Sequence, residues 1–307
     1  MTTSDLTRGD EGYAAGTRLA AERGSVAVET LQAGERLLTL SGEYKPIVRI
    51  HRRRIGCGGR PASEQVWPVV IAAGAFGEGS PERDLVVSPD LALFVDGGLA
   101  PAIRLVNGAT IRQAPVADVD YWQIELAAHE VIYAEGLPAE SCLGLGGDET
   151  CFRHVDDAGL VALRESLLRR TADFGFAFED EPDLHALADG RRIEPLRLSE
   201  NRFAFAFPAG VAQALLVSRV WRPSEATPDN RDPRTLGVCL SRLDVDGSTL
   251  DLSDERLSEG WSWYETAGRQ RWTTGRASLP AGLRIALLDI CGRGLYLRRP
   301  RPFALEA

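Results

Sequence analysis

The chain has 307 residues, of which 44% are hydrophobic, and it carries a net charge of −9. This length and apolar content can build the cores of two domains. The acidic balance disfavours general nucleic-acid binding, because an acidic surface repels phosphate backbones. Two arginine runs, Arg52–Arg54 and Arg298–Arg301, are local exceptions that we interpret as solvated strand ends.

The cysteines and histidines predict neither a metal site nor a disulfide framework. The five cysteines contain no C-x-x-C pair, and only four histidines are present. The N-terminal residues lack the apolar segment of a Sec-type signal peptide, and no run approaches the roughly 18 apolar residues of a membrane span. We therefore expect a cytoplasmic protein with no metal, no cofactor and no membrane span, while export by another route stays open.

Residues 1–10 are polar and predict a disordered tail, and residues 11–152 have the texture of an all-β domain. Short apolar runs alternate there with Gly, Pro, Asn and Asp, which is typical of short strands joined by tight turns. The expected strands lie at residues 25–30, 36–40, 47–50, 67–72, 85–87, 91–95, 103–106, 121–126 and 130–134.

The pattern changes in residues 153–195, which we expect to form a short helical connector. Asp156 and Asp157 suit the start of a helix, leucines follow at spacings of three and four residues, and Arg169 and Arg170 suit its end. We interpret this segment as a packing helix without chemistry of its own.

Residues 196–307 return to alternating strand patterns and predict a second, antiparallel β-sandwich-like domain. Phe203, Phe205 and Phe207 alternate strictly, so we expect them to face inward on one strand. The predicted fold class is therefore mainly β, with a β-domain, a helical connector and a β-sandwich.

The first domain contains an ordered series of short motifs. Residues 16–19 read G-T-R-L, residues 26–31 read V-A-V-E-T-L, and residues 34–39 read G-E-R-L-L-T. Further motifs lie at residues 74–77, 83–85, 88–90, 105–110 and 134–141, so the series covers about residues 12–152. In this order the motifs resemble the bacterial Hint (Hedgehog/intein) family, in the form found in α-proteobacteria. The resemblance implies a Hint β-fold whose active members cleave or splice their own backbone.

That chemistry needs a nucleophile that attacks the preceding carbonyl and an acid that protonates the departing amide nitrogen. The resemblance implies a Cys-Phe pair where this chain has Gly12-Tyr13, and a histidine where it has Leu91. Ser88 stands in place of a threonine in the same motif. Glycine offers no attacking atom, and leucine cannot transfer a proton.

Two more positions depart from the family pattern. Gln123 stands where relatives carry a histidine, and it can form hydrogen bonds but does not titrate. Glu140-Ser141 stands where a splicing domain has His-Asn, so no succinimide can form. His129 remains nearby, and we interpret it as a structural residue.

We interpret the losses at positions 12, 91 and 123 together as a fold that is kept and a reaction that is lost. The predicted function is then a non-processing Hint-domain protein that acts as a binding or assembly module. An autoprocessing domain with atypical residues stays open as an alternative.

The second domain resembles the β-rich extension that often follows Hint domains of this kind, and it is rich in aromatic residues. Such rings can stack on sugars while charged side chains bind hydroxyl groups, so a carbohydrate-binding protein is a further alternative. We favour the plainer interpretation that these tryptophans fill the sandwich core. The candidate ligand-binding residues are Trp261, Trp263, Trp272, Arg219, Arg271 and Glu265, and the partner, protein or glycan, is not identified by the sequence.

Overall fold

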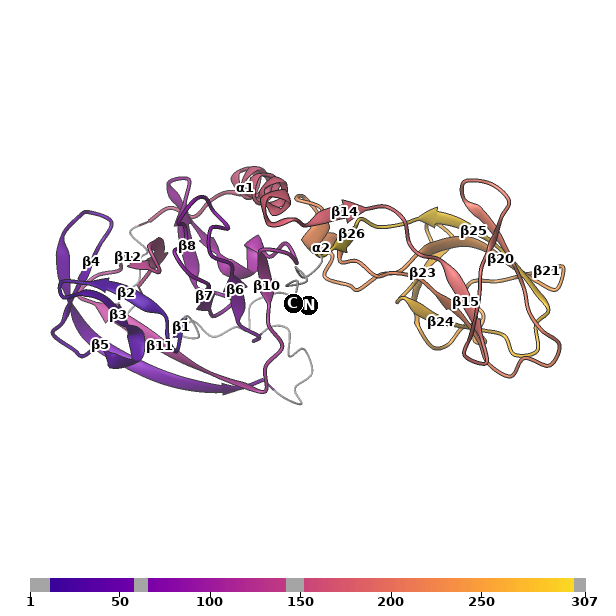
Figure 1. Cartoon of the computed structure of the whole chain (residues 1–307), viewed down its shortest axis with the longest axis horizontal. Helices are drawn as coiled ribbons and strands as arrows, with labels where there is room; N and C mark the ends of the chain where they lie inside the picture. Colours follow the sequence, from indigo (N-terminus) through magenta and orange to yellow (C-terminus); the bar gives the residue numbers. More distant parts are fainter. Residues whose placement is uncertain (1–11, 58–65, 142–151, 301–307) are drawn as a thin grey trace, which may run out of the picture. The chain divides into compact units, whose positions relative to one another are not determined.

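A computed structural model describes residues 12–57, 66–141 and 152–300 of the chain. The described residues are mainly β, which confirms the predicted fold class. The chain divides into two compact units, Met1–Gly175 and Phe176–Ala307, each of which is described by itself (Figure 1). The predicted disordered tail at residues 1–10 lies outside the described residues.

The first unit is built on one continuous sheet of thirteen strands. Its hydrogen-bonded order is β10-β6-β7-β1-β11-β5-β4-β2-β12-β13-β8-β9, with β3 paired to β2. Paired strands are antiparallel throughout. The strands are β1 (Tyr13–Ala14), β2 (Arg18–Ala21), β3 (Gly24–Ala27), β4 (Arg36–Leu38), β5 (Tyr44–Gly56), β6 (Val69–Ile71), β7 (Leu85–Val87), β8 (Ala92–Val95), β9 (Gly98–Pro101), β10 (Ile111–Gln113), β11 (Asp118–Leu126), β12 (Val131–Ala134) and β13 (Leu137–Glu140).

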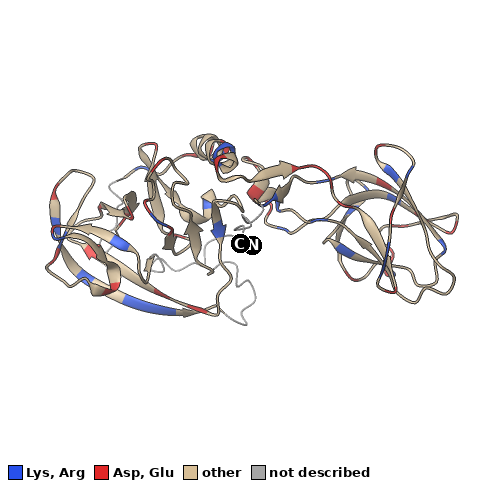
Figure 2. Cartoon of the chain, viewed as in Figure 1, with Lys and Arg blue, Asp and Glu red and all other residues tan. Residues whose placement is uncertain are grey.

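Strands β5 and β11 form the longest ladder of this sheet, and β5 contains the run Arg52–Arg54. Figure 2 colours the Lys and Arg positions along β5 blue. Opposite charges face each other across the two strands, so the arginines are neutralised locally, as on an ordinary solvated strand pair. The cross-strand ion pairs are Arg49–Glu125, Arg52–Asp120 and Arg54–Asp118.

Helix α1 (Asp157–Arg170) follows the sheet. The prediction of a helical connector over residues 153–195 is wrong beyond this helix, because Ala177–Glu179, His185–Ala188 and Arg191–Ile193 are strands of the second unit. The side chain of Asp156 caps it by accepting a hydrogen bond of 2.8 Å from the Gly159 N–H. Leu160, Leu163 and Leu167 are buried in the same apolar core as the strands of the first unit. No described helix has both the length and the apolarity that crossing a membrane requires.

The second unit contains two larger antiparallel sheets with one shared apolar core. One sheet has the order β16-β15-β19-β24, and the other has the order β17-β18-β25-β20-β23-β22 with β21 on β20. A separate pair joins β14 to β26. The elements are β14 (Ala177–Glu179), β15 (His185–Ala188), β16 (Arg191–Ile193), β17 (Leu196–Arg197), β18 (Arg202–Ala206), β19 (Ala214–Val217), α2 (Pro223–Ala226), β20 (Cys239–Val245), β21 (Ser248–Leu250), β22 (Trp261–Glu265), β23 (Gln270–Thr273), β24 (Arg276–Leu279), β25 (Ile285–Gly292) and β26 (Tyr296–Arg298).

Residues from both sheets contribute to that core, which is the arrangement of a β-sandwich. Phe203, Phe205 and Phe207 are all buried in it, so the inward face predicted from their alternation is confirmed. Trp261 and Trp272 lie on paired strands of the larger sheet, which confirms that they belong to one β-domain.

Candidate functional site

Gly12 and Ser88 lie against each other where β1 begins and β7 ends. The Gly12 N–H donates a hydrogen bond of 2.8 Å to Ser88 Oγ, and the Ser88 N–H donates one of 2.9 Å to the Gly12 carbonyl. The Leu91 N–H in turn donates to the Ser88 carbonyl at 3.3 Å. Gly12, Ser88 and Leu91, three of the positions at which this chain departs from the family pattern, therefore lie together in the interior.

The space beside Gly12 is occupied by strand β11. A Cβ atom built at position 12 would lie 2.9 Å from Tyr121 Cβ and 3.2 Å from the Trp122 carbonyl oxygen. The first distance is shorter than real Cβ contacts, and neither neighbouring atom is the mobile end of a flexible side chain. Any side chain at position 12 would therefore require a shift of the backbone.

Leu91 is completely buried and belongs to the main apolar core of the first unit. Its backbone carbonyl accepts a hydrogen bond of 2.9 Å from the Ala102 N–H, which fixes the segment after the Ser88 turn. Position 91 thus contributes packing and backbone hydrogen bonds, and its side chain offers no group that could transfer a proton.

Glu140 is at the centre of a set of buried polar contacts with Tyr13 and Ala92, the residues that directly follow Gly12 and Leu91. The Tyr13 hydroxyl donates a hydrogen bond of 2.6 Å to the Glu140 carbonyl, and the Ala92 N–H donates one of 2.6 Å to Glu140 Oε1. Nε2 of His129 lies 3.3 Å from Glu140 Oε2, and the His129 ring packs edge-on against Phe152 at 5.8 Å. Glu140 therefore joins the first residues of β1 to the start of β8.

His129 is enclosed, and its ring makes no hydrogen bond to any described residue. The contact with Glu140 is an ion pair only when the imidazole is protonated. We interpret His129 as a structural residue, because its ring is enclosed and packs against Phe152 and Glu140.

Burial and nearby charge disfavour ionisation of two further groups in this region. Burial, followed by the charge of Glu140, raises the pKa of Asp90. Burial also raises the pKa of the Tyr121 hydroxyl far above its usual range, and Cys57 and Asp90 add to the effect. The Tyr121 hydroxyl is buried and has no hydrogen-bond partner among the described residues. The Asp90 carboxyl and the Tyr121 hydroxyl thus both lie in poorly solvated surroundings that disfavour their charged forms.

The remaining positions of the family pattern lie in structural roles. Gln123 follows Trp122 on β11 and stands opposite His51 on β5. The Ser141 N–H donates to the Glu130 carbonyl at 2.7 Å, and Ser141 Oγ accepts from the Glu130 N–H at 2.9 Å. Ser141 thereby closes the open end of the β12–β13 hairpin.

Tyr13, Asp90 and Tyr121 also belong to this region, although the sequence alone indicates no role for them. One signal was present, because Tyr13 stands where the family pattern has phenylalanine, and the added hydroxyl needs a partner when it is buried. The partner, the Glu140 carbonyl, is far away in sequence and could not be identified from spacing.

In the second unit, four of the six candidate ligand-binding residues are engaged in internal contacts. Trp261 is buried, with only 8% of its surface exposed, and its Nε1–H donates to the Ser278 carbonyl at 2.8 Å. The Arg271 guanidinium donates to two backbone carbonyls at 2.7 and 2.9 Å. Trp272 packs on Trp221 with ring centroids 6.2 Å apart, and Arg219 donates to Glu179 at 2.9 Å.

The other two candidates, Trp263 and Glu265, come together on a different partner, Arg234, which the sequence analysis did not select. The guanidinium carbon of Arg234 lies 4.3 Å from the centroid of the Trp263 ring, and Glu265 Oε1 accepts hydrogen bonds from Arg234 at 3.3 and 3.4 Å. Within the described part of the chain, no group of three or more His, Cys, Asp or Glu residues could hold a metal ion.

Comparison with known proteins finds a family model that matches part of the first unit. The family model described as the Hint domain matches residues 11–145. A search of curated proteins found no significant match.

Solved inteins and an intein-like domain are similar in structure to less than half of the chain. The gp41-1 intein is 12% identical with a TM-score of 0.32, and the match covers 42% of this chain and 97% of that one. A DnaB intein from Synechocystis sp. PCC 6803 is 7% identical with a TM-score of 0.33, covering 43% and 99%. A bacterial intein-like domain from Clostridium thermocellum is 15% identical with a TM-score of 0.30, covering 43% and 99%.

Proposed function

Because residues 11–145 form a Hint domain, we propose that this domain has lost self-processing and acts as a binding or assembly module. The observation that carries the proposal is the closed position 12. The residue there has no side chain, and the nearest atoms of Tyr121 and Trp122 leave no room for one on this backbone.

The energetics of the family reaction support this proposal. Enzymes typically lower a reaction barrier by about 8 kcal/mol or more, and general acid–base help alone contributes roughly 10²–10⁴-fold. Gly12 supplies no attacking atom, and Leu91 supplies no acid. Preorganised backbone donors that could stabilise an oxyanion accelerate nothing unless a nucleophile attacks.

The polar groups around position 12 already serve the fold. Ser88 Oγ accepts the Gly12 N–H, and Glu140 accepts hydrogen bonds from Tyr13 and from the Ala92 N–H. A domain of this kind that does not cleave itself can act only by binding another molecule or by taking part in an assembly through its surface. This is why we infer a binding or assembly role in place of a reaction.

The test is the intact mass of the purified full-length chain after prolonged incubation with and without dithiothreitol. We expect the mass of the complete 307-residue chain under both conditions, because a thiol can intercept only a thioester that forms. A parallel sample incubated in urea serves as the control, since cleavage that persists in the unfolded chain comes from a contaminating protease.

A fragment that begins at residue 12 or 13 and forms only in the folded sample would overturn the proposal. Ser88→Ala then decides the alternative, because Ser88 Oγ is the hydroxyl in contact with the backbone of Gly12. If this substitution abolishes the cleavage, the domain is an autoprocessing enzyme with atypical residues.

A further inference from the structure

Trp263 is the exposed tryptophan of the second unit, with 64% of its surface open to solvent. Simple strand alternation would place it on the same face as Trp261, which is buried two residues earlier. The pairing of β22 with β23 is irregular between Trp261 and Tyr264. An irregularity of this kind re-aims side chains, so the second indole faces water while the first fills the core.

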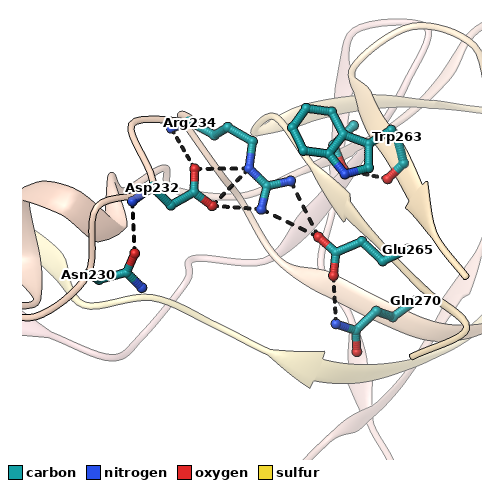
Figure 3. A network of polar contacts seen from close by, with 7 residues as sticks. Asn230, Asp232, Arg234, Trp263, Glu265 and Gln270 are labelled. Atoms are coloured by element: carbon teal, nitrogen blue, oxygen red, sulfur yellow. Dashed lines mark hydrogen bonds and ion pairs between the residues drawn. The ribbon is translucent and has the colours of Figure 1, made fainter. Parts of the chain in front are cut away.

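The indole of Trp263 is held in place by Arg234. The guanidinium carbon lies 4.3 Å from the ring centroid, which is a cation–π contact. Figure 3 shows the guanidinium between the carboxylates of Asp232 and Glu265, with the indole beside it. Asp232 accepts from Arg234 at 2.6 to 3.0 Å, and Glu265 accepts at 3.3 and 3.4 Å.

The network extends to an amide on the next strand. Gln270 Nε2 donates a hydrogen bond of 2.9 Å to Glu265 Oε2. The side chains of Asp232, Arg234 and Glu265 each keep about a quarter of their surface exposed, at 24, 24 and 25%. Arg234 therefore covers one face of the indole, most of the Trp263 surface stays in solvent, and the carboxylates that hold Arg234 remain partly exposed nearby.

We propose that Trp263, Arg234, Asp232 and Glu265 form a binding site for an uncharged sugar ring. A pyranose has a face of C–H groups that packs on an aromatic ring and a rim of hydroxyl groups that both donate and accept hydrogen bonds. The indole suits that face, while the carboxylates and the amide beside it suit the hydroxyl groups. This site is independent of the role proposed for the Hint domain.

The charge of the network selects against anionic ligands. Asp232 and Glu265 carry two negative charges and Arg234 carries one positive charge, so the site is negative overall. Phosphates, uronic acids and other anions are repelled, and the guanidinium is already paired with carboxylates. A neutral hexose or N-acetylhexosamine meets no such penalty.

The network also prepares the ring for binding. Two carboxylates fix Arg234, and Arg234 fixes the indole, so little side-chain freedom is lost when a sugar stacks on it. A cation–π contact that served only to stabilise the fold would not require the Trp263 ring to remain exposed to solvent. The exposure and the fixed position of the ring together favour a ligand.

The test is isothermal titration of the full-length chain with hexasaccharides. The neutral probes are cellohexaose, maltohexaose, laminarihexaose, mannohexaose and the hexamer of N-acetylglucosamine, and the anionic probe is hexagalacturonate. We expect at least one neutral probe to bind and hexagalacturonate to bind more weakly. Trp263→Ala should weaken binding of the neutral probe at least tenfold, whereas Trp263→Tyr, which keeps an aromatic face, should retain most of it.

Leu196→Ala is the matched control, since Leu196 has 65% of its surface exposed and lies on the same sheet. It should leave binding unchanged, and thermal unfolding of each variant verifies the fold. Absence of binding to all neutral probes would overturn the proposal, as would equal losses in the Trp263 and Leu196 variants. Stronger binding of hexagalacturonate than of every neutral probe would also overturn it.

Discussion

Gly12→Ala is the sharpest test of the idea that position 12 is closed. The added methyl group would lie 2.9 Å from Tyr121 Cβ and 3.2 Å from the Trp122 carbonyl oxygen. One of these atoms is a Cβ atom and the other is a backbone oxygen, and both belong to β11. The steric clash can therefore be relieved only if the backbone of this strand moves. Overpacking of this kind typically costs about 1–3 kcal/mol.

Gly56→Ala provides the matched control. Gly56 ends β5, and a Cβ built there meets no atom within 4 Å. Replacing glycine by alanine at a site without strain stabilises a protein by about 0.4–1 kcal/mol, because the unfolded chain loses freedom. The two substitutions share the same chemistry and should therefore change the free energy of unfolding in opposite directions.

The measurement is urea unfolding of the full-length chain, followed by hydrogen exchange in peptides from Asp118–Leu126, which reports on the first unit. We expect Gly12→Ala to lower the protection of these amides and Gly56→Ala to preserve or raise it. A Gly12→Ala variant as stable as the Gly56 variant would refute the reasoning, because position 12 would then have room for a nucleophile.

Further predictions concern titration and thiol reactivity. Since the pKa of Asp90 is raised in the folded chain, its ionised form destabilises that state. Asp90→Asn should therefore raise the urea midpoint at pH 7, and the gain should vanish as the pH falls towards the ordinary carboxyl pKa near 4; equal gains at both pH values would contradict this. With iodoacetamide, exposed Cys291 should react before buried Cys57 and Cys239, since burial raises the pKa of the Cys239 thiol. Peptide mass mapping measures the order, and faster labelling of either buried thiol would exclude it.

Short-range patterns explain how much of the fold could be predicted from the sequence. The alternation of Phe203, Phe205 and Phe207 needs only the two-residue period of a strand, and all three residues are buried. The helix signal of Asp156 likewise depends on neighbours three residues away, and the structure has that cap. Such features are fixed locally, so one sequence is enough to find them.

The Trp263 site could not be predicted in this way. Trp263 is exposed because the register between β22 and β23 shifts after Trp261, so the two indoles face different sides. The residue pattern alone does not show where such a register shift occurs. The charged partner of Trp263, Arg234, lies outside any strand and is separated from Glu265 by 31 residues. Of the six candidates chosen from the sequence, Trp263 and Glu265 contact Arg234, whereas Arg219 and Arg271 contact other groups.

Turn signals can also mislead about what they connect. Asn107-Gly108 has the sequence of a hairpin turn, yet it lies between the short helix Ala102–Leu105 and β10. The Asn107 side chain is buried and accepts hydrogen bonds from the Ala109 and Ile111 N–H groups, each at 3.0 Å. The pair therefore makes a turn, but not one that joins two partnered strands.

Leu91 and Tyr13 both fit a well-packed interior. A buried histidine at position 91 would need hydrogen-bond partners for its ring nitrogens, whereas Leu91 contributes apolar burial worth about 1.5–3 kcal/mol without such a requirement. Tyr13 uses its hydroxyl to bind the Glu140 carbonyl across the domain. The burial of Leu91 and the hydrogen bond of Tyr13 therefore both contribute to the stability of the first unit, whether or not any reaction takes place there.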